Sequence, residues 1–134
     1  MEEYIVKESS LQFKRPRVKK FIFIENNDFK QEEFNGFKIN SSIDVYKSQD
    51  NNSAMVELTL MIGESVATVP FTVEAVIWSV FKWKDDMENI DRMLNQNAPA
   101  LLLSYLRPIV SNAVSNAGMP PFDIPFMDFT EDGK

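Results

Sequence analysis

The segment from Ala98 to Ala117, APALLLSYLRPIVSNAVSNA, constrains the fold of this chain more than any other feature of the sequence. Pro99 suits a first helical turn and Gly118 predicts a left-handed helix end, so the segment is expected to be one helix. Because each fully buried Leu or Ile contributes about 1.5–3 kcal/mol, its apolar side chains are expected to avoid water. They form two neighbouring stripes, Leu102, Leu106, Ile109 and Ala113 on one, and Leu103, Val110, Val114 and Ala117 on the other.

In several stretches between residues 11 and 83, apolar and polar side chains alternate with a period of two, which is typical of half-buried strands. Pro16 predicts a bend or bulge in the first strand. The segment 26–36 is long for a hairpin loop, so it is expected to cross over other strands. The last strand becomes apolar on both faces, which predicts cover on both. The four predicted strands are residues 11–24, 37–47, 54–62 and 66–83.

Four strands followed by a helix predict an α+β fold, a four-stranded antiparallel sheet with the long C-terminal helix packed on one face. A separate short helix is expected before Pro99, because Met87, Ile90 and Leu94 lie at helical spacing. The last strand and the helix carry more apolar surface than one subunit of this size can bury. The sequence therefore predicts a homo-oligomer.

The 134 residues contain no internal repeat, linker or low-complexity segment, so residues 1–134 are expected to form a single domain. At its ends, residues 1–9 are predicted to be a loose lead-in and residues 130–134 a short tail. The N-terminus has no apolar run of signal-peptide length, and no stretch reaches the roughly 18 apolar residues of a membrane span. We therefore expect a cytoplasmic protein without an integral membrane segment.

The sequence contains neither cysteine nor histidine. Disulfides, thiolate metal sites and cysteine nucleophiles are thereby excluded, and the commonest acid or base at neutral pH is missing. Catalysis by carboxylates or lysine stays open, but no enzyme activity, metal or cofactor is expected. The net charge of −6 argues against a nucleic-acid binder.

Three groups of charged residues each allow a functional and a structural interpretation. The basic run KRPRVKK, residues 14–20, could bind phosphate, but an edge strand protected by charge is favoured. The acidic run KDDMENIDR, residues 84–92, lacks the glycine of a calcium loop, so a solvated helix start is favoured. Glu57 and Glu74 are expected on a solvated sheet face rather than as a catalytic acid and base.

The stretch SNAGMPPFDIPFMDF, residues 115–129, is too interrupted by proline for a helix and too apolar for an ordinary loop. In one interpretation its aromatic and aliphatic residues complete the core. In the other they form a partly exposed apolar surface for a partner, and the adaptable thioethers of Met119 and Met127 favour this second interpretation.

The region NAPALLLSYLRPIVSNAVSNAGMPPFDIPFMDF resembles the corresponding region of the SecB secretion chaperones. In that family an apolar helix carries an aromatic residue and then an arginine, which correspond to Tyr105 and Arg107. The helix ends at a small residue, here Gly118. Hydrophobic residues then alternate after a proline, as they do here over residues 121–129.

The N-terminal LQFKRPRVKKFIFIEN is also similar to the first strand of that family, which leads into an acidic, Asn-rich crossover. The resemblance covers roughly residues 10–129, and its last third is the specific part. It implies a four-stranded antiparallel sheet with a long helix, assembled as a dimer of dimers. Helices of different subunits would meet through Leu102, Leu103, Leu106, Ile109, Val110, Ala113 and Val114.

The resemblance further implies an ATP-independent holdase that keeps export precursors unfolded and passes them to the SecA motor. Unfolded preproteins would bind in apolar grooves between the crossover and the segment after the helix. The corresponding substrate-binding residues are Phe29, Phe34, Phe37, Met119, Phe122, Ile124, Phe126 and Met127.

Two departures from the family pattern matter for function. The family usually has a second C-terminal helix beside the groove, whereas only five residues follow Phe129, so that wall is expected to be missing or supplied by a neighbour. The family also carries acids for SecA on the first strand, where this chain has Lys20 and Ile24. A SecB-like chaperone for another client, such as an antitoxin, is therefore the alternative.

Two further classes of function remain open from the sequence. The first is a carrier of an apolar small molecule, bound in an aromatic cavity near Trp78 and Trp83. The second is a structural interaction subunit whose apolar faces are all consumed by self-association.

Overall fold

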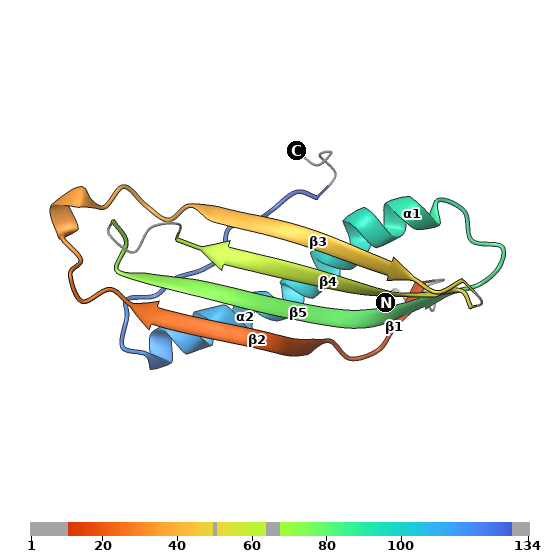
Figure 1. Ribbon diagram of the computed structural model, residues 1–134, viewed down its shortest axis with the longest axis horizontal. Coiled ribbons are helices and arrows are strands. Elements are labelled where there is room, and N and C mark those ends of the chain that lie inside the picture. Colours follow the sequence, from red (N-terminus) through yellow and green to blue (C-terminus); the bar gives the residue numbers. More distant parts are fainter. Residues whose placement is uncertain (1–10, 50, 64–67, 130–134) are drawn as a thin grey trace, which may run out of the picture.

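A computed structural model describes residues 11–49, 51–63 and 68–129, so the predicted lead-in and tail lie outside the described residues. One antiparallel sheet carries one long helix on a single face (Figure 1). In the sheet, β5 (Phe71–Trp83) pairs with β4 (Ser53–Ile62), which pairs with β3 (Ile39–Lys47) at one edge. On its other side β5 pairs with β1 (Leu11–Phe13) and β2 (Arg17–Glu25). The predicted α+β fold is confirmed, with five strands instead of four.

The additional strand arises because the predicted first strand is broken at Pro16, which has no N–H to donate to the sheet. Around the break, the Lys14 N–H donates to the carbonyl of Val80 at 3.0 Å, and the hydroxyl of Ser79 donates to the carbonyl of Lys14. Ser79 is buried among apolar neighbours, and this bond satisfies its hydroxyl. The bend predicted from Pro16 is therefore real and is sharp enough to separate two strands.

The segment between β2 and β3 connects the two opposite edges of the sheet, since β5 and β4 lie between these strands. It contains one short 3-10 turn, η1 (Gln31–Glu33), and lies at one end of the sheet (Figure 1). The predicted crossover, which we call the crossover segment (residues 26–38), is confirmed.

The helix is longer than predicted, because α1 (Ile90–Arg92), a π turn η2 (Met93–Asn97) and α2 (Ala98–Asn116) follow one another without interruption. The separate short helix before Pro99 was wrong. A proline ring clashes with the carbonyl four residues back. Here that carbonyl belongs to Asn95, inside the π turn, where the α-helical bonding pattern is already replaced.

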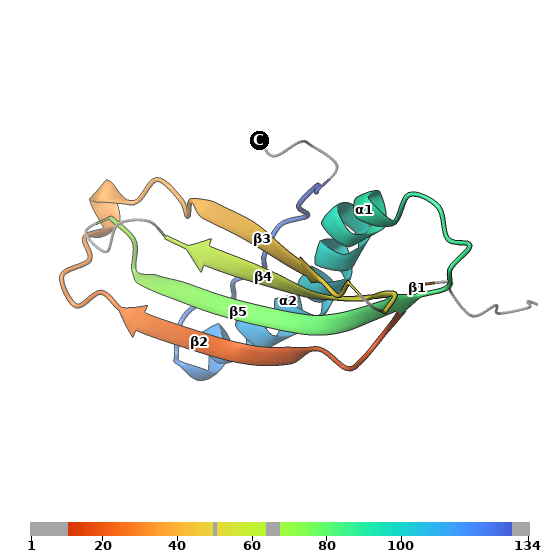
Figure 2. The ribbon, with the colours of Figure 1, turned by 45° about the vertical axis from the view of Figure 1, so that its right-hand side comes forward.

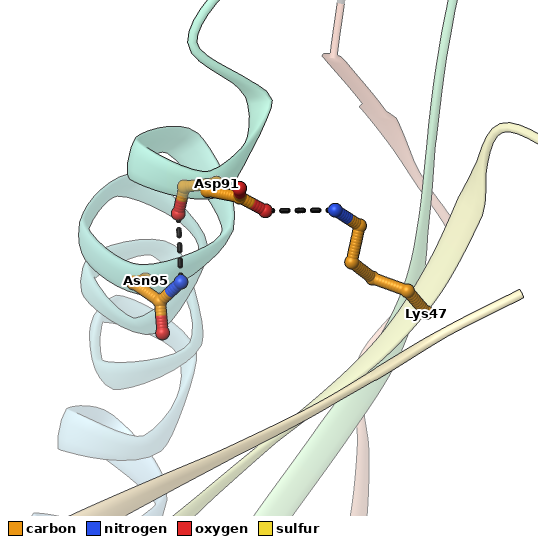
Figure 3. A network of polar contacts seen from close by, with 3 residues as sticks. All are labelled: Lys47, Asp91 and Asn95. Atoms are coloured by element: carbon orange, nitrogen blue, oxygen red, sulfur yellow. Dashed lines mark hydrogen bonds and ion pairs between the residues drawn. The ribbon is translucent and has the colours of Figure 1, made fainter.

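A polar network fixes the start of this helix to the sheet (Figure 3). Lys47 Nζ of β3 forms an ion pair with Asp91 Oδ1 at 2.8 Å, and Asn95 Nδ2 donates to the Asp91 carbonyl at 2.7 Å. The acidic run therefore includes a helix start bound to a neighbouring strand. From there the helix runs diagonally behind the sheet (Figures 1 and 2).

The helix ends at Gly118, as predicted, in the left-handed conformation with φ of 89°. The Gly118 N–H donates to the Ser115 carbonyl at 3.0 Å, and the Met119 N–H donates to the Val114 carbonyl at 3.2 Å. These two bonds are the Schellman pattern, which satisfies the last carbonyls of a helix. The cap turns the chain sharply, and residues 119–129, the post-helix segment, return across the same face of the sheet (Figure 2).

The core lies between the inner face of the sheet, the helix and the post-helix segment. The strand 54–62 alternates as predicted, because its inward residues Ala54, Val56, Leu58, Leu60 and Ile62 are all buried. β5 is buried mainly on the same inner face, while Trp78 and Val80 on the outer face stay half-buried. The predicted cover of both faces of β5 is therefore found on its inner face, whereas on the described outer face Val76 is the one buried residue of this strand. Among the described residues, no helix is long and apolar enough to cross a membrane.

Candidate functional site

An open apolar groove with a volume of about 440 Å³ lies at the crossover end of the sheet. Three parts of the chain form it: the crossover segment, the start of β5 and the post-helix segment. Its lining is almost entirely aromatic rings and proline rings, with one polar side chain. The lining residues are Phe29, Gln31, Phe34, Phe37, Pro70, Phe71, Pro120, Pro121 and Phe122.

The phenylalanine rings of the groove form one connected cluster. Phe37 is its centre, with ring centroids 5.3 Å from Phe34, 4.7 Å from Phe71 and 4.9 Å from Phe122. Phe29 extends the cluster, 5.7 Å from Phe34 in an edge-to-face arrangement. Such pairs contribute about 0.5–1.5 kcal/mol beyond the burial of their area. The cluster is therefore held together internally while one side of it stays open.

Asn26 positions the crossover wall of the groove. Its backbone N–H donates to the Pro70 carbonyl at 2.9 Å, and its side-chain amide donates to the Val69 carbonyl at 3.0 Å. Its side-chain oxygen accepts from the Asp28 N–H at 2.9 Å, which shapes the turn leading to Phe29. One side chain thus connects the crossover segment to the start of β5.

The wall from the post-helix segment is fixed at both of its ends. The helix cap at Gly118 sets its direction, and Ile124 anchors it in the core with only 1% of its surface exposed. Phe122 lies between these two points and remains half-buried. The backbone conformation at Gly118 therefore fixes the start of this wall, and the burial of Ile124 fixes its end.

Of the eight residues predicted to bind substrate, the structure brings four together in this groove: Phe29, Phe34, Phe37 and Phe122. Met119 packs against the core, outside the groove lining. Ile124 needs correction, because a fully buried side chain has no surface to offer a substrate. The alternation of residues 121–129 could not separate core from groove positions, since both are apolar.

Phe126 and Met127 lie away from the aromatic groove. They line a smaller pocket of about 160 Å³ against the helix, together with Ala100, Leu103, Ser104 and Arg107. Phe126 is 84% exposed, the most exposed large apolar side chain among the described residues. The post-helix segment thus divides into a part that completes the core and a part that leaves apolar side chains exposed.

The sequence analysis did not predict five of the groove residues. These are Gln31, Pro70, Phe71, Pro120 and Pro121. The signal for Phe71 was available, because it begins the last strand directly beside the crossover. Phe71 also belongs to the core, since it is 2% exposed, and its ring centroid lies 5.9 Å from that of Phe122.

The helix residues predicted for a subunit interface are mostly used within the subunit. Sheet and post-helix segment together bury five of the eight residues of the two stripes, so the helix leaves less apolar surface for a second copy than the sequence predicted. Ile109 stays 38% exposed and Ala113 half-buried. Those already buried in the subunit core are Leu102, Leu103, Leu106, Val110 and Val114.

In the part of the chain that the structure describes, no helix covers the outer face of the sheet (Figure 1). On it Glu57 forms an ion pair with Lys19 at 2.8 Å, and Glu74 forms one with Lys20 at 2.9 Å. The hydrogen bond to Glu57 raises the pKa of Lys19 above its ordinary value. Each carboxylate thus lies on the outer sheet face and is paired with a lysine of its own.

The two tryptophans lie on opposite faces of β5. Trp78 pairs with Glu57 on the outer face, whereas Trp83 pairs with Leu11 and packs against the core. Within the described residues the two tryptophans therefore cannot line one shared cavity, as the small-molecule interpretation predicted.

These features define a class of protein: a single antiparallel sheet with one helical layer and an open aromatic groove. Within the described ranges no three acidic side chains are placed to hold a metal ion. The chain belongs to the SecB family, since the sequence model of that family, described as "Preprotein translocase subunit SecB", matches residues 8–131. The resemblance seen in the sequence is thereby confirmed, and this family is one of protein-export chaperones.

Individual relatives agree with this assignment. The protein-export protein SecB of Ehrlichia ruminantium (strain Gardel) is 30% identical over 92 residues, which are 60% of this chain and 53% of that protein. That of Bartonella quintana (strain Toulouse) is 33% identical over 81 residues, covering 60% and 51%. The chain therefore spans about half the length of the curated relatives it matches.

Two solved structures share the fold. The SecB-like chaperone Rv1957 of Mycobacterium tuberculosis, in complex with a ChAD peptide from the Rv1956 HigA1 antitoxin, gives a TM-score of 0.63 at 14% identity. That match covers 89% of this chain and 91% of the other. A Streptococcus agalactiae protein of unknown function gives 0.53 at 12% identity, covering 87% and 97%.

Proposed function

We propose that this protein is an ATP-independent holdase of the cytoplasm, which binds unfolded preproteins and supports protein export. The observation that carries the proposal is the open cluster of phenylalanines in the 440 Å³ groove. A chain that keeps an aromatic cluster partly open forgoes burial energy, which points to an apolar ligand. Membership of the SecB family supports the same activity.

Binding would proceed by burial of apolar side chains from an extended client segment against the rings of the groove. The groove offers few hydrogen-bonding side chains, so it would select clients by apolar content rather than by sequence. No bond is made or broken, and release would follow from the weak affinity of a single groove. Several grooves on one oligomer would raise the overall affinity for a long client.

The proposed holdase is a homo-oligomer, a dimer or a tetramer. Support comes from a flank of the subunit where the helix meets the bend between β1 and β2. There Phe13, Val18, Tyr105 and Ile109 are all exposed, and the rings of Phe13 and Tyr105 lie 6.2 Å apart. This flank, rather than the buried helix stripes, is proposed to meet a second copy of the chain.

The partner that receives the client is proposed to be either SecA or a dedicated client system. Lys20 and Ile24 stand where the family resemblance places acids for SecA, and both lie on the outer face of β2. Lys20 is also paired with Glu74, which reduces the negative charge of that face. An antitoxin client is the second candidate, favoured by these departures and by the similar fold of a SecB-like chaperone that binds an antitoxin peptide.

The decisive experiment measures the aggregation of a denatured secretory precursor by light scattering. The Phe34→Ala/Phe122→Ala variant removes two rings from two walls of the groove. Each removed anchor weakens binding, so the protein concentration needed for half suppression should rise about tenfold. Circular dichroism establishes that the variant remains folded.

The matched control is Tyr46→Ala, which removes an exposed aromatic ring from the outer face of β3. It should suppress aggregation as well as the unmodified protein does. Full suppression by the groove variant, or an equal loss in the control, would show that clients do not use the groove.

A further inference from the structure

The bend between β1 and β2 carries a cluster of positive charge that the groove does not use. Lys14, Arg15 and Arg17 are all exposed, in a chain with a net charge of −6. In the described parts of the chain, neither Lys14 nor Arg15 forms an ion pair. The neighbouring Lys19 and Lys20 differ, because each is neutralised by a glutamate of the sheet.

The bend is held in place rather than left loose. The Lys14 N–H donates to β5 at the Val80 carbonyl, and the Lys14 carbonyl accepts from the buried hydroxyl of Ser79. Ser79 is the one polar residue among the buried side chains of the described ranges. Edge protection alone requires charge on the strand. It does not require a buried serine that fixes the strand break at this place.

A small pocket opens beside the bend on the outer face of the sheet. Its volume is about 250 Å³, and it is lined by Lys19, Met55, Glu57 and Trp78. Arg17 stands at its rim, with its guanidinium carbon 5.9 Å from the centre of the Trp78 ring. The pocket therefore has an apolar floor of indole and thioether, the paired charges of Lys19 and Glu57 on its wall, and the guanidinium of Arg17 near its rim.

We infer that this surface, the bend together with the pocket, binds a short acidic segment of a partner protein. One apolar side chain of that segment would occupy the pocket on Trp78 and Met55. Its flanking carboxylates would accept hydrogen bonds from Arg15 and Arg17, which suit planar, two-point recognition of carboxylates. This site is separate from the aromatic groove and does not depend on the holdase function.

The size and charge of the surface favour a peptide over other anions. A volume of about 250 Å³ is below the roughly 300–1,000 Å³ typical of sites for whole small molecules, and it suits one side chain. A nucleic acid would meet three cations at the bend that are unpaired within the described residues, Lys14, Arg15 and Arg17, on a chain with a pI of about 4.7, whereas nucleic-acid-binding domains are usually strongly basic.

The test uses the fluorescence of Trp78. The Trp83→Phe variant leaves Trp78 as the only tryptophan of the chain. A synthetic peptide that alternates glutamate with leucine should change this fluorescence in a saturable way, and its glutamine twin should not. Arg15→Gln/Arg17→Gln in this background should raise the dissociation constant of the peptide about tenfold, and added salt should raise it further.

The control variant Lys30→Gln/Lys84→Gln removes two exposed lysines elsewhere and makes the same change in net charge. It should leave the peptide affinity unchanged, and so should Phe34→Ala/Phe122→Ala. The inference is overturned if the glutamine twin binds equally well or if the control loses as much affinity as the arginine variant. It is also overturned if no saturable change occurs, or if an oligonucleotide of equal charge displaces the peptide at equal concentration.

Discussion

Two glycines with nearly the same backbone conformation should differ in how much a change to alanine lowers the free energy of unfolding. Gly63 has φ of 83° and Gly118 has φ of 89°, so alanine is strained at both, by about 1–2 kcal/mol. Around Gly118 a Cβ would meet no atom within 4 Å. At Gly63 it would lie 3.1 Å from the Phe71 carbonyl oxygen and 3.2 Å from side-chain atoms of Thr72 and Val69.

The magnitudes follow from these surroundings. Both alanines also stiffen the unfolded chain, which offsets about 0.4–1 kcal/mol of the strain. Gly118→Ala should therefore reduce the free energy of unfolding by about 1 kcal/mol. Gly63→Ala adds the cost of crowding, about 1–3 kcal/mol. The difference between the two variants isolates the crowding, because the strain and the unfolded-state effect are common to both.

Urea unfolding measures this difference directly. With a denaturant slope of about 1–3 kcal/mol/M, Gly63→Ala should unfold at a midpoint roughly 1 M lower than Gly118→Ala. Both variants must be compared at one protein concentration, because oligomer formation would make stability depend on concentration. Equal midpoints, or a lower midpoint for Gly118→Ala, would refute the reasoning from close contacts.

Two further predictions concern the surface. Ile109→Asp places a charge on the flank proposed to meet a second copy. Light scattering coupled to size exclusion should therefore give a lower molar mass for this variant. Ala100→Asp, on the opposite side of the helix, should leave the molar mass unchanged. The pKa of Lys19 is raised above 10.5 by its hydrogen bond to Glu57. This pair therefore stabilises the fold below the ordinary lysine pKa and is lost as the pH rises through the raised value. As the pH rises through the strongly alkaline range, the urea midpoint of unfolding should consequently fall less steeply for Lys19→Met than for the unmodified protein.

The sheet and the helix end could be predicted because their causes are local. Alternation of apolar residues fixed the inward side of 54–62, and the sequence Gly118-Met-Pro-Pro contains the whole chemistry of the cap. The break at Pro16 was also visible in the sequence. That the break separates two strands could not be predicted, because it depends on Ser79, which lies 65 residues away along the chain and donates to the Lys14 carbonyl.

The groove was half predictable for a related reason. Phe29, Phe34 and Phe37 lie on a segment with no other apolar neighbours in sequence, so they had to meet something distant. Ile124 and Phe122 differ by two positions and are both apolar, yet one is buried and one lines the groove. The position of the helix beneath the segment decides which of the two side chains is buried and which lines the groove, and no local sequence pattern predicts that position.

The walls of the groove come from residues near 30, 70 and 120, so the groove is complete only once all three have been synthesised and folded together. When about two thirds of the chain has been made, the crossover segment and the start of β5 are present but the wall from the post-helix segment is not. At that stage the aromatic cluster lacks its third wall, and the proposed client groove would be complete only after residues near 120 have been made.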